Sequence, residues 1–91
     1  METKLRHDPA LIEAHAANQR AVALANVPDY VIADYEAMTP AQRRYQHGIA
    51  EFQADRHDIL ASRPGHPSND YNRQCAANYR RTAAALKAIG L

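Results

Sequence analysis

The sequence predicts an all-α fold, a small helical bundle of three long helices and one short connector helix. Three helix-start signals indicate this class, each a capping residue at or beside a proline: Asp8-Pro9, Thr39-Pro40 and Pro67-Ser68. A Ser, Thr or Asp side chain accepts a hydrogen bond from a free N–H of the first turn, where proline sacrifices no bond. Alanine-rich amphipathic sequence follows each signal, and no pair of β-like runs is present to form a sheet.

The composition predicts one domain, residues 1–91, with a flexible N-terminus at residues 1–8 and a small core. Leu, Ile, Val and Phe together number 15, whereas alanine numbers 19 and tyrosine five. Alanine lets helices approach closely but removes little apolar area from water. We therefore expect a thin core, a marginally stable monomer, and self-association as a homodimer.

The first helix is predicted from Pro9 to Ala25. Its polar sector consists of Glu13 and Arg20 only, and Asn18 lies apart from them. Apolar residues or alanines occupy most of the remaining surface. A helix that is apolar on most sides is covered on two sides in a folded protein. The sequence does not decide whether the other helices of the same chain or a copy of this helix from another chain cover it.

The second segment, from about Asp29 to Met38, is predicted as a short connector helix. The run at residues 30–32 also suits a strand, but a lone strand has no partner for its backbone groups. Helical spacing gives this segment an inward face of Val31, Tyr35 and Met38.

The third helix is predicted from Pro40 to about Ser62 and has a clear amphipathic pattern. Gly48 interrupts the helix and marks either a close approach or a weak point. Arg56 lies at the centre of the apolar sector, where it either extends its head to water or forms an ion pair or interface contact. The apolar sector, expected to face inward, consists of Tyr45, Ile49, Phe52, Ile59 and Leu60.

A turn at residues 63–67 is predicted to reverse the chain, because two prolines and a glycine cannot continue a helix. The last helix, from about Ser68 to Ile89, then runs antiparallel to the third and stops at Gly90. Its inward stripe is predicted to be Tyr71, Cys75, Tyr79, Thr82, Leu86 and Ile89. The single cysteine, Cys75, fits a small buried thiol on this stripe.

Two charged stripes are predicted to lie on solvent-facing sides of the last two long helices. One carries His47, Glu51, Asp55 and Asp58, and the other carries Arg73, Arg80 and Lys87 with Arg81 beside them. The first stripe offers metal ligands one turn apart, but it lacks the specificity of an HExxH motif and a second ligand set. We therefore expect no metal and no cofactor.

The sequence contains no combination of residues that indicates catalysis. There is no nucleophile with an adjacent base, no glycine-rich phosphate loop and no paired-carboxylate motif, so we expect a protein that is not an enzyme. The first seven residues lack the apolar core of a signal peptide, and no run approaches the roughly 18 apolar residues of a membrane span. These features predict a cytoplasmic protein. Nine arginines against two lysines are typical of GC-rich bacterial genomes and their phages.

Charge is unevenly distributed along the chain. Residues 1–39 carry three basic and six acidic side chains, whereas residues 40–91 carry eight basic and four acidic ones. This polarity favours a stoichiometric regulator or inhibitor that binds a macromolecule, with a protein as the first expectation and a nucleic acid as the alternative. The net charge of +1 is small for a nucleic-acid-binding domain. The predicted partner-binding residues are Arg73, Arg80, Arg81 and Lys87, followed by Arg43 and Arg44.

Overall fold

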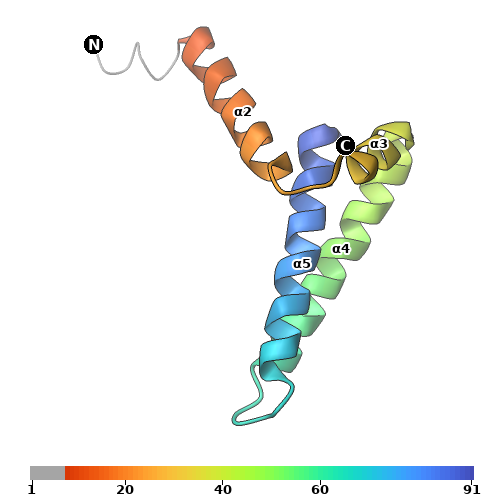
Figure 1. Ribbon diagram of the computed structural model, residues 1–91. Helices are drawn as coiled ribbons and strands as arrows, with labels where there is room; N and C mark the ends of the chain where they lie inside the picture. Colours follow the sequence, from red (N-terminus) through yellow and green to blue (C-terminus); the bar gives the residue numbers. More distant parts are fainter. Residues whose placement is uncertain (1–7) are drawn as a thin grey trace.

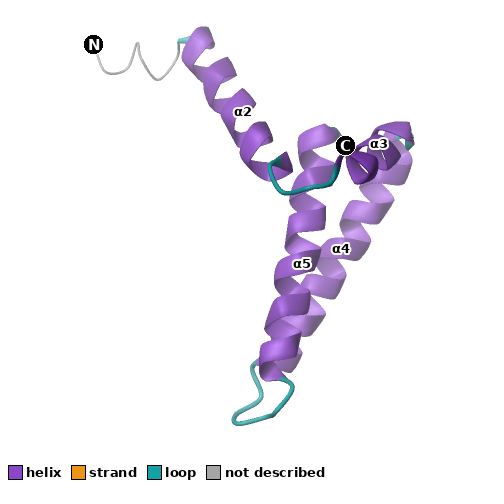
Figure 2. Cartoon of the chain, in the orientation of Figure 1, coloured by secondary structure: helices purple, strands orange, loops and turns teal. Residues whose placement is uncertain are grey.

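The computed structural model describes residues 8–91 and is entirely helical over that part of the chain (Figures 1 and 2). The predicted N-terminal segment 1–8 lies outside the described residues except for Asp8. The four helices are α2 (Pro9–Leu24), α3 (Asp29–Ala37), α4 (Pro40–Ala61) and α5 (Asn69–Ile89). Each begins and ends within about two residues of the predicted position, so the all-α prediction is confirmed.

Two of the three predicted start signals cap their helices through a side chain. The Asp8 carboxylate accepts from the Ala10 N–H at 2.9 Å. Thr39 forms a capping box, in which its hydroxyl accepts from the Gln42 N–H at 3.1 Å and the Gln42 side chain accepts from the Thr39 N–H at 2.8 Å. Ser68 precedes α5 but makes no side-chain cap. Gly90 ends α5 with φ of 136°, a conformation that side-chain-bearing residues rarely adopt.

Helices α4 and α5 form an antiparallel hairpin whose seam consists mainly of alanine (Figure 1). Short side chains let the two backbones approach closely, so dispersion contacts between them accumulate along the seam. Leu86 is the one large side chain of residues 8–91 that is fully buried, with 0% of its surface exposed. The buried alanines are Ala50, Ala54, Ala61, Ala76, Ala83 and Ala85.

The predicted inward face of α4 is wrong. Phe52 is 66% exposed and Ile59 is 71% exposed, Tyr45 and Ile49 are exposed as well, and of the predicted sector only Leu60 is half-buried. The packed face is the one that carries Ala50, Ala54 and Ala61, where short side chains let the backbone of α5 approach closely. Arg56, predicted at the centre of the inward sector, is therefore exposed as well.

The predicted inward stripe of α5 is largely correct. Leu86 is buried, Cys75, Tyr79, Thr82 and Ile89 are half-buried, and only Tyr71 is exposed. Helix α3 packs near the C-terminal end of α5, with its predicted face of Val31, Tyr35 and Met38 half-buried. None of the described helices is long and apolar enough to cross a membrane.

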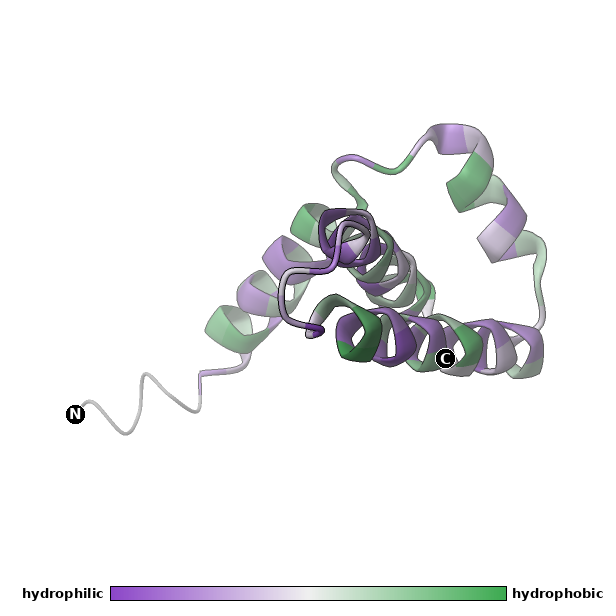
Figure 3. Cartoon of the chain, turned by 90° about the horizontal axis from the view of Figure 1, so that it is seen from below, coloured by the Kyte–Doolittle hydropathy of each residue, from purple (hydrophilic) through white to green (hydrophobic). Residues whose placement is uncertain are grey.

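Helix α2 projects away from the hairpin (Figure 1). Residues 9–22 are all exposed, and only Ala23 and Leu24 are half-buried. Viewed from below, hydrophobic turns of α2 stand clear of the hairpin (Figure 3). The sequence left open whether this helix packs against its own chain or against another copy, and its own chain covers very little of it.

Replacing Gly48 with alanine is expected to stabilise the protein by about 1 kcal/mol, because glycine is a poor helix former inside α4. The substitution fits, since a Cβ built at Gly48 meets nothing within 4 Å. The predicted close approach at this position is thus absent within the described chain. Thermal unfolding followed by circular dichroism should show a rise in Tm of about 4–8 °C. An unchanged or lower Tm would mean that another molecule contacts this position.

Candidate interaction surfaces

The two charged stripes are largely exposed, as predicted, and Arg80 also reaches the acidic stripe across one side of the α4/α5 seam. Arg80 forms ion pairs with Asp58 and, at 3.5 Å, with Asp55. His47 lies 3.1 Å from Glu51 on the same side of α4. The hydrogen bond from Arg80 and its positive charge hold the pKa of Asp58 below its usual range, and Asp58 in turn raises the pKa of Arg80. These charges are compatible with the rotation at which the alanine sides of the two helices pack together.

The six predicted partner-binding residues are distributed over the two ends and one side of the hairpin. Arg73 pairs with Asp70 and Arg81 bonds to Asn78, each three residues earlier on α5. Lys87 lines a groove along the α4/α5 seam together with His47 and Glu51, and it forms no ion pair with residues 8–91. The structure therefore does not bring these six side chains together into one patch, and their role in partner binding stays a prediction.

Arg43 joins the ends of three helices. Its guanidinium donates to the Met38 carbonyl at 2.6 Å, to the Tyr35 carbonyl at 3.1 Å and to the Gly90 carbonyl. These carbonyls lie at the ends of α3 and α5, where backbone partners for the last C=O groups run out; the Tyr35 carbonyl also accepts from the Met38 N–H at 3.2 Å. Arg44 contributes one weaker bond to the Leu91 carbonyl at 3.2 Å. Arg43 therefore has a structural role that occupies its hydrogen-bonding groups.

A polar cluster that the sequence analysis missed crosses the other side of the seam. The ring of His57 lies 2.8 Å from the side-chain oxygen of Asn72 and stacks on Tyr79 with ring centroids 5.7 Å apart. Asn72 is buried, and its amide also donates to the Ser68 carbonyl. The spacing of Asn72 with Ala76 and Ala83 was the available signal, since it continues the stripe of small residues. Both the oxygen and the nitrogen of the buried Asn72 amide therefore have a partner, as buried polar groups require.

The outer face of α4 is an apolar surface that the hairpin leaves uncovered. We define it by Tyr45, Ile49, Phe52 and Ile59, with Arg56 among them, and all five are exposed. The residues follow one another at three, four or seven positions, so they share one side of the helix. From Tyr45 to Ile59 the face is about 20 Å long at 1.5 Å per residue.

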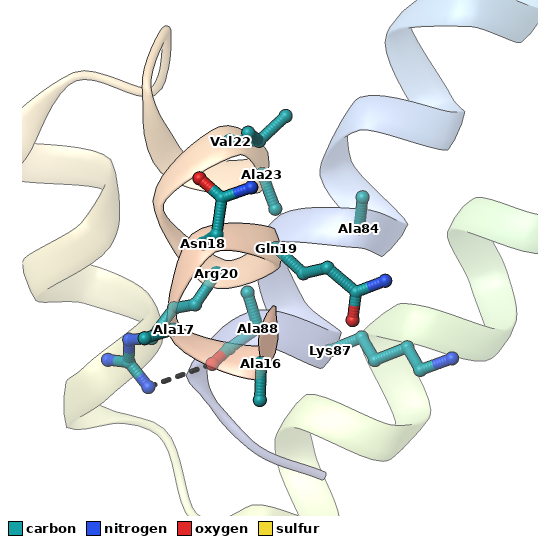
Figure 4. Close-up of a pocket in the computed structure, with 10 residues that line it drawn as sticks. All are labelled: Ala16, Ala17, Asn18, Gln19, Arg20, Val22, Ala23, Ala84, Lys87 and Ala88. Atoms are coloured by element: carbon teal, nitrogen blue, oxygen red, sulfur yellow. Dashed lines mark hydrogen bonds between the residues drawn. The ribbon is translucent and has the colours of Figure 1, made fainter. Parts of the chain in front are cut away.

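A second open surface is the groove between α2 and α5, about 800 Å³ in volume. Figure 4 shows it lined by small residues of both helices, with Gln19 and Lys87 at one edge. The guanidinium of Arg20 donates to the Ala88 carbonyl at 2.9 Å and fixes which side of α2 faces α5. The groove lacks the convergent polar groups of a small-molecule site.

The described residues hold no group of three or more His, Cys, Asp or Glu side chains that could bind a metal ion. Two acids of the predicted stripe, Asp55 and Asp58, are already paired with Arg80. The chain matches no known protein-family model, no curated protein and no solved structure. Its function must therefore be argued from its own surfaces.

Proposed function

We propose that this chain is a non-enzymatic protein-interaction module, a stoichiometric regulator or inhibitor of bacterial or phage origin that acts in the cytoplasm. The observation that supports the proposal is the outer face of α4. Four large apolar side chains stand exposed around one arginine on a helix whose other side is packed. Large contiguous apolar patches on single chains mark interaction sites.

The residue types of the outer face favour a protein partner. Aromatic residues and arginine are enriched where protein interfaces gain most of their binding energy. Tyr45 and Phe52 supply two aromatic rings, and Arg56 supplies a charged group with an apolar stem. The complementary partner surface is an apolar helix or groove that offers a carboxylate opposite Arg56.

The arrangement of the basic residues gives less support to the nucleic-acid alternative. Phosphate binding needs cationic groups that are free to face the backbone of DNA or RNA. Arg43 and Arg44 bond to carbonyls of their own chain, and Arg80 faces two carboxylates. The remaining exposed basic groups can still steer an acidic partner toward the hairpin.

We also propose that the protein acts as a homodimer. The support is the thin core together with helix α2, which buries no residue in its own chain. An amphipathic or apolar helix of this length is marginal in water without tertiary packing.

The partner-binding proposal is tested by comparing immobilised wild-type protein with the Phe52→Asp variant in native cell extracts. A carboxylate in the middle of the outer face should weaken partner binding by at least about 30-fold, the effect of a hot-spot residue. Quantitative mass spectrometry identifies stoichiometrically retained proteins, and calorimetry with the purified partner measures the affinity.

The matched control is Gln46→Asp, which introduces the same residue at another exposed position of α4. Both variants should keep the wild-type helical spectrum because neither position is buried. Equal retention by wild-type and Phe52→Asp proteins would refute the proposed surface. Retention of nucleic acid alone, with a steep loss of binding as salt increases, would favour the alternative function.

A further inference from the structure

The acids of α4 and its Arg56 lie on different sides of the helix. The three acids, Glu51, Asp55 and Asp58, follow one another at intervals of four and three residues, so they share one side. Asp55 and Asp58 pair there with Arg80 of α5. The outer face of α4, in contrast, carries Arg56 and no acid. An apolar surface with one positive charge is therefore left without a carboxylate of its own.

Arg56 has no ionic partner in the part of the chain that the structure describes. It is exposed, and its guanidinium makes one long contact, 3.5 Å to the side-chain oxygen of Gln53. None of the ion pairs among residues 8–91 includes it. A molecule that covers the outer face removes water from this guanidinium, and a buried charge is stable only when it is paired. The covering molecule must therefore supply a carboxylate.

Gly48 provides room on this side for the backbone of another helix. It follows Tyr45 by three residues and precedes Phe52 by four, so it lies between them on the same side of α4. Gly48 is exposed, and a Cβ built there meets nothing within 4 Å. Glycine destabilises a helix interior, and no contact within residues 8–91 requires it here. It does permit close backbone approach, which brings two crossing helices to the low end of the usual axis separation of about 8–10 Å.

We propose, building on the proposed function, that the outer face of α4 binds an acidic amphipathic helix of another protein. The partner helix crosses α4 at Gly48 and packs its apolar side on the four large apolar side chains of the outer face. It places an Asp or Glu side chain opposite Arg56. A helix of about 14 residues is long enough to cover the face, with apolar residues recurring at every third or fourth position.

A second copy of this chain suits the outer face less well than a helix of another protein. When two outer faces meet, each presents Arg56 and neither presents a carboxylate. Both guanidiniums then lose water without gaining an ionic partner, and like charges at an interface disfavour that pairing. The proposed homodimer must therefore use another surface.

The first experiment selects peptides from a display library on immobilised wild-type protein. Each member is a helix of about 18 residues with a fixed seam of leucine and alanine, and its flanking positions are either glutamate or lysine. Members with glutamate should be enriched by at least about tenfold over members with lysine, because only they offer a carboxylate to Arg56. The same selection on Arg56→Glu protein should reverse the preference. A variant that is merely unfolded loses both kinds of peptide and does not gain the lysine-bearing ones.

The second experiment fills the gap at Gly48. Gly48→Leu should weaken binding of the selected glutamate peptide by at least about tenfold in calorimetry, because the leucine occupies the place of the partner's backbone. Its Tm should not fall, since leucine is the better helix former and the position is open. Gln46→Leu is the matched control, because it adds the same side chain at an exposed position about 160° away around α4. It should leave binding unchanged.

The outcomes separate the acidic helix from the proposed function on which it rests. Equal retention of cell-extract proteins by wild-type and Phe52→Asp proteins overturns both together. A retained partner that depends on Phe52 but binds Arg56→Glu protein equally well overturns the acidic helix alone. So does a library selection that enriches lysine-bearing peptides or no peptide at all, or a glutamate peptide that binds Gly48→Leu as tightly as wild-type protein.

Two anionic ligands of other classes are tested with the same variants. Vesicles of phosphatidylserine and phosphatidylcholine are used in a sedimentation assay, and duplex DNA is used in a salt titration. Binding to the vesicles or to the DNA that is lost in Phe52→Asp, without enrichment of glutamate peptides, overturns the acidic helix in favour of that ligand. Absence of both, together with the charge-reversed selection by Arg56→Glu, supports it.

Discussion

Replacing Leu86 with alanine is expected to lower the free energy of unfolding by about 3 kcal/mol, and by more if the resulting cavity cannot collapse. Leu86 is fully buried, and the other buried apolar residues of the described chain are all alanines. Alanines have no flexible side chain that could move into the vacated space. Because a domain of this size is stable by only about 5–15 kcal/mol, this one substitution removes a large part of the total.

The measurement is urea unfolding followed by circular dichroism, with the midpoint and slope compared between variants. Ile59→Ala is the matched control, since it removes a similar volume from a side chain that is 71% exposed. It should change stability by no more than about 0.5 kcal/mol. If Ile59→Ala costs as much as Leu86→Ala, then the free protein packs the outer face of α4 and our account of the core is wrong.

Replacing Arg43 with alanine is expected to cost about 2–3 kcal/mol, because three carbonyls lose a charged hydrogen-bond donor. The carbonyls of Tyr35, Met38 and Gly90 all lose this donor together, and only the Tyr35 carbonyl keeps a backbone partner, the Met38 N–H. The loss is local as well as global, since Arg43 connects the end of α3 with the end of α5. Hydrogen exchange should therefore accelerate most in α3 and in the last turn of α5.

Arg44→Ala is the control for this second prediction. Arg44 neighbours Arg43 on α4 but makes one exposed bond, to the Leu91 carbonyl. It should change stability by less than about 0.5 kcal/mol, the usual range for a surface substitution. Similar effects of the two substitutions would show that loss of positive charge, and not loss of the Arg43 contacts, is responsible.

The ends of the helices could be predicted from sequence because the signals are local. Thr39 and Gln42 cap one helix within four residues, and Pro9 fits the first turn wherever the helix lies. Gly90 likewise ends α5 through its own φ of 136°. Such signals depend on neighbours along the chain and not on how the helices later pack.

The choice of packed face could not be predicted in the same way. On α4 the large apolar residues and the alanines lie on different sides, and hydrophobicity alone favours the side with Phe52 and Ile59. The hairpin instead uses the side with Ala50 and Ala54, where α5 can approach closely. The charged flanks agree with that rotation, since Arg80 meets Asp55 and Asp58 only when the alanine sides face each other.

The same reasoning applies to the candidate surfaces. Six basic residues were predicted to bind a partner, but Arg80, Arg43 and Arg44 bond to acceptors on other helices or at the chain end, which a sequence pattern does not show. Arg43 is the clearest case, because its three acceptors belong to α5 and to the end of α3. The apolar residues of α4 were predicted to face inward, whereas all but Leu60 are exposed, and the mostly apolar surface of α2 was predicted correctly without showing how little of it its own chain covers.

The amino-acid sequence by itself determined that this protein is helical, where each helix starts and stops, and that its core is poor in large side chains. These properties follow from backbone conformational preferences and composition, which act over a few residues. Only the tertiary structure decided that alanine fills the seam, that opposite charges meet across it, and that α2 and the outer face of α4 remain uncovered. Those outcomes depend on which surfaces approach each other in space, because contacts between helices far apart along the chain are set by close packing and not by local preferences.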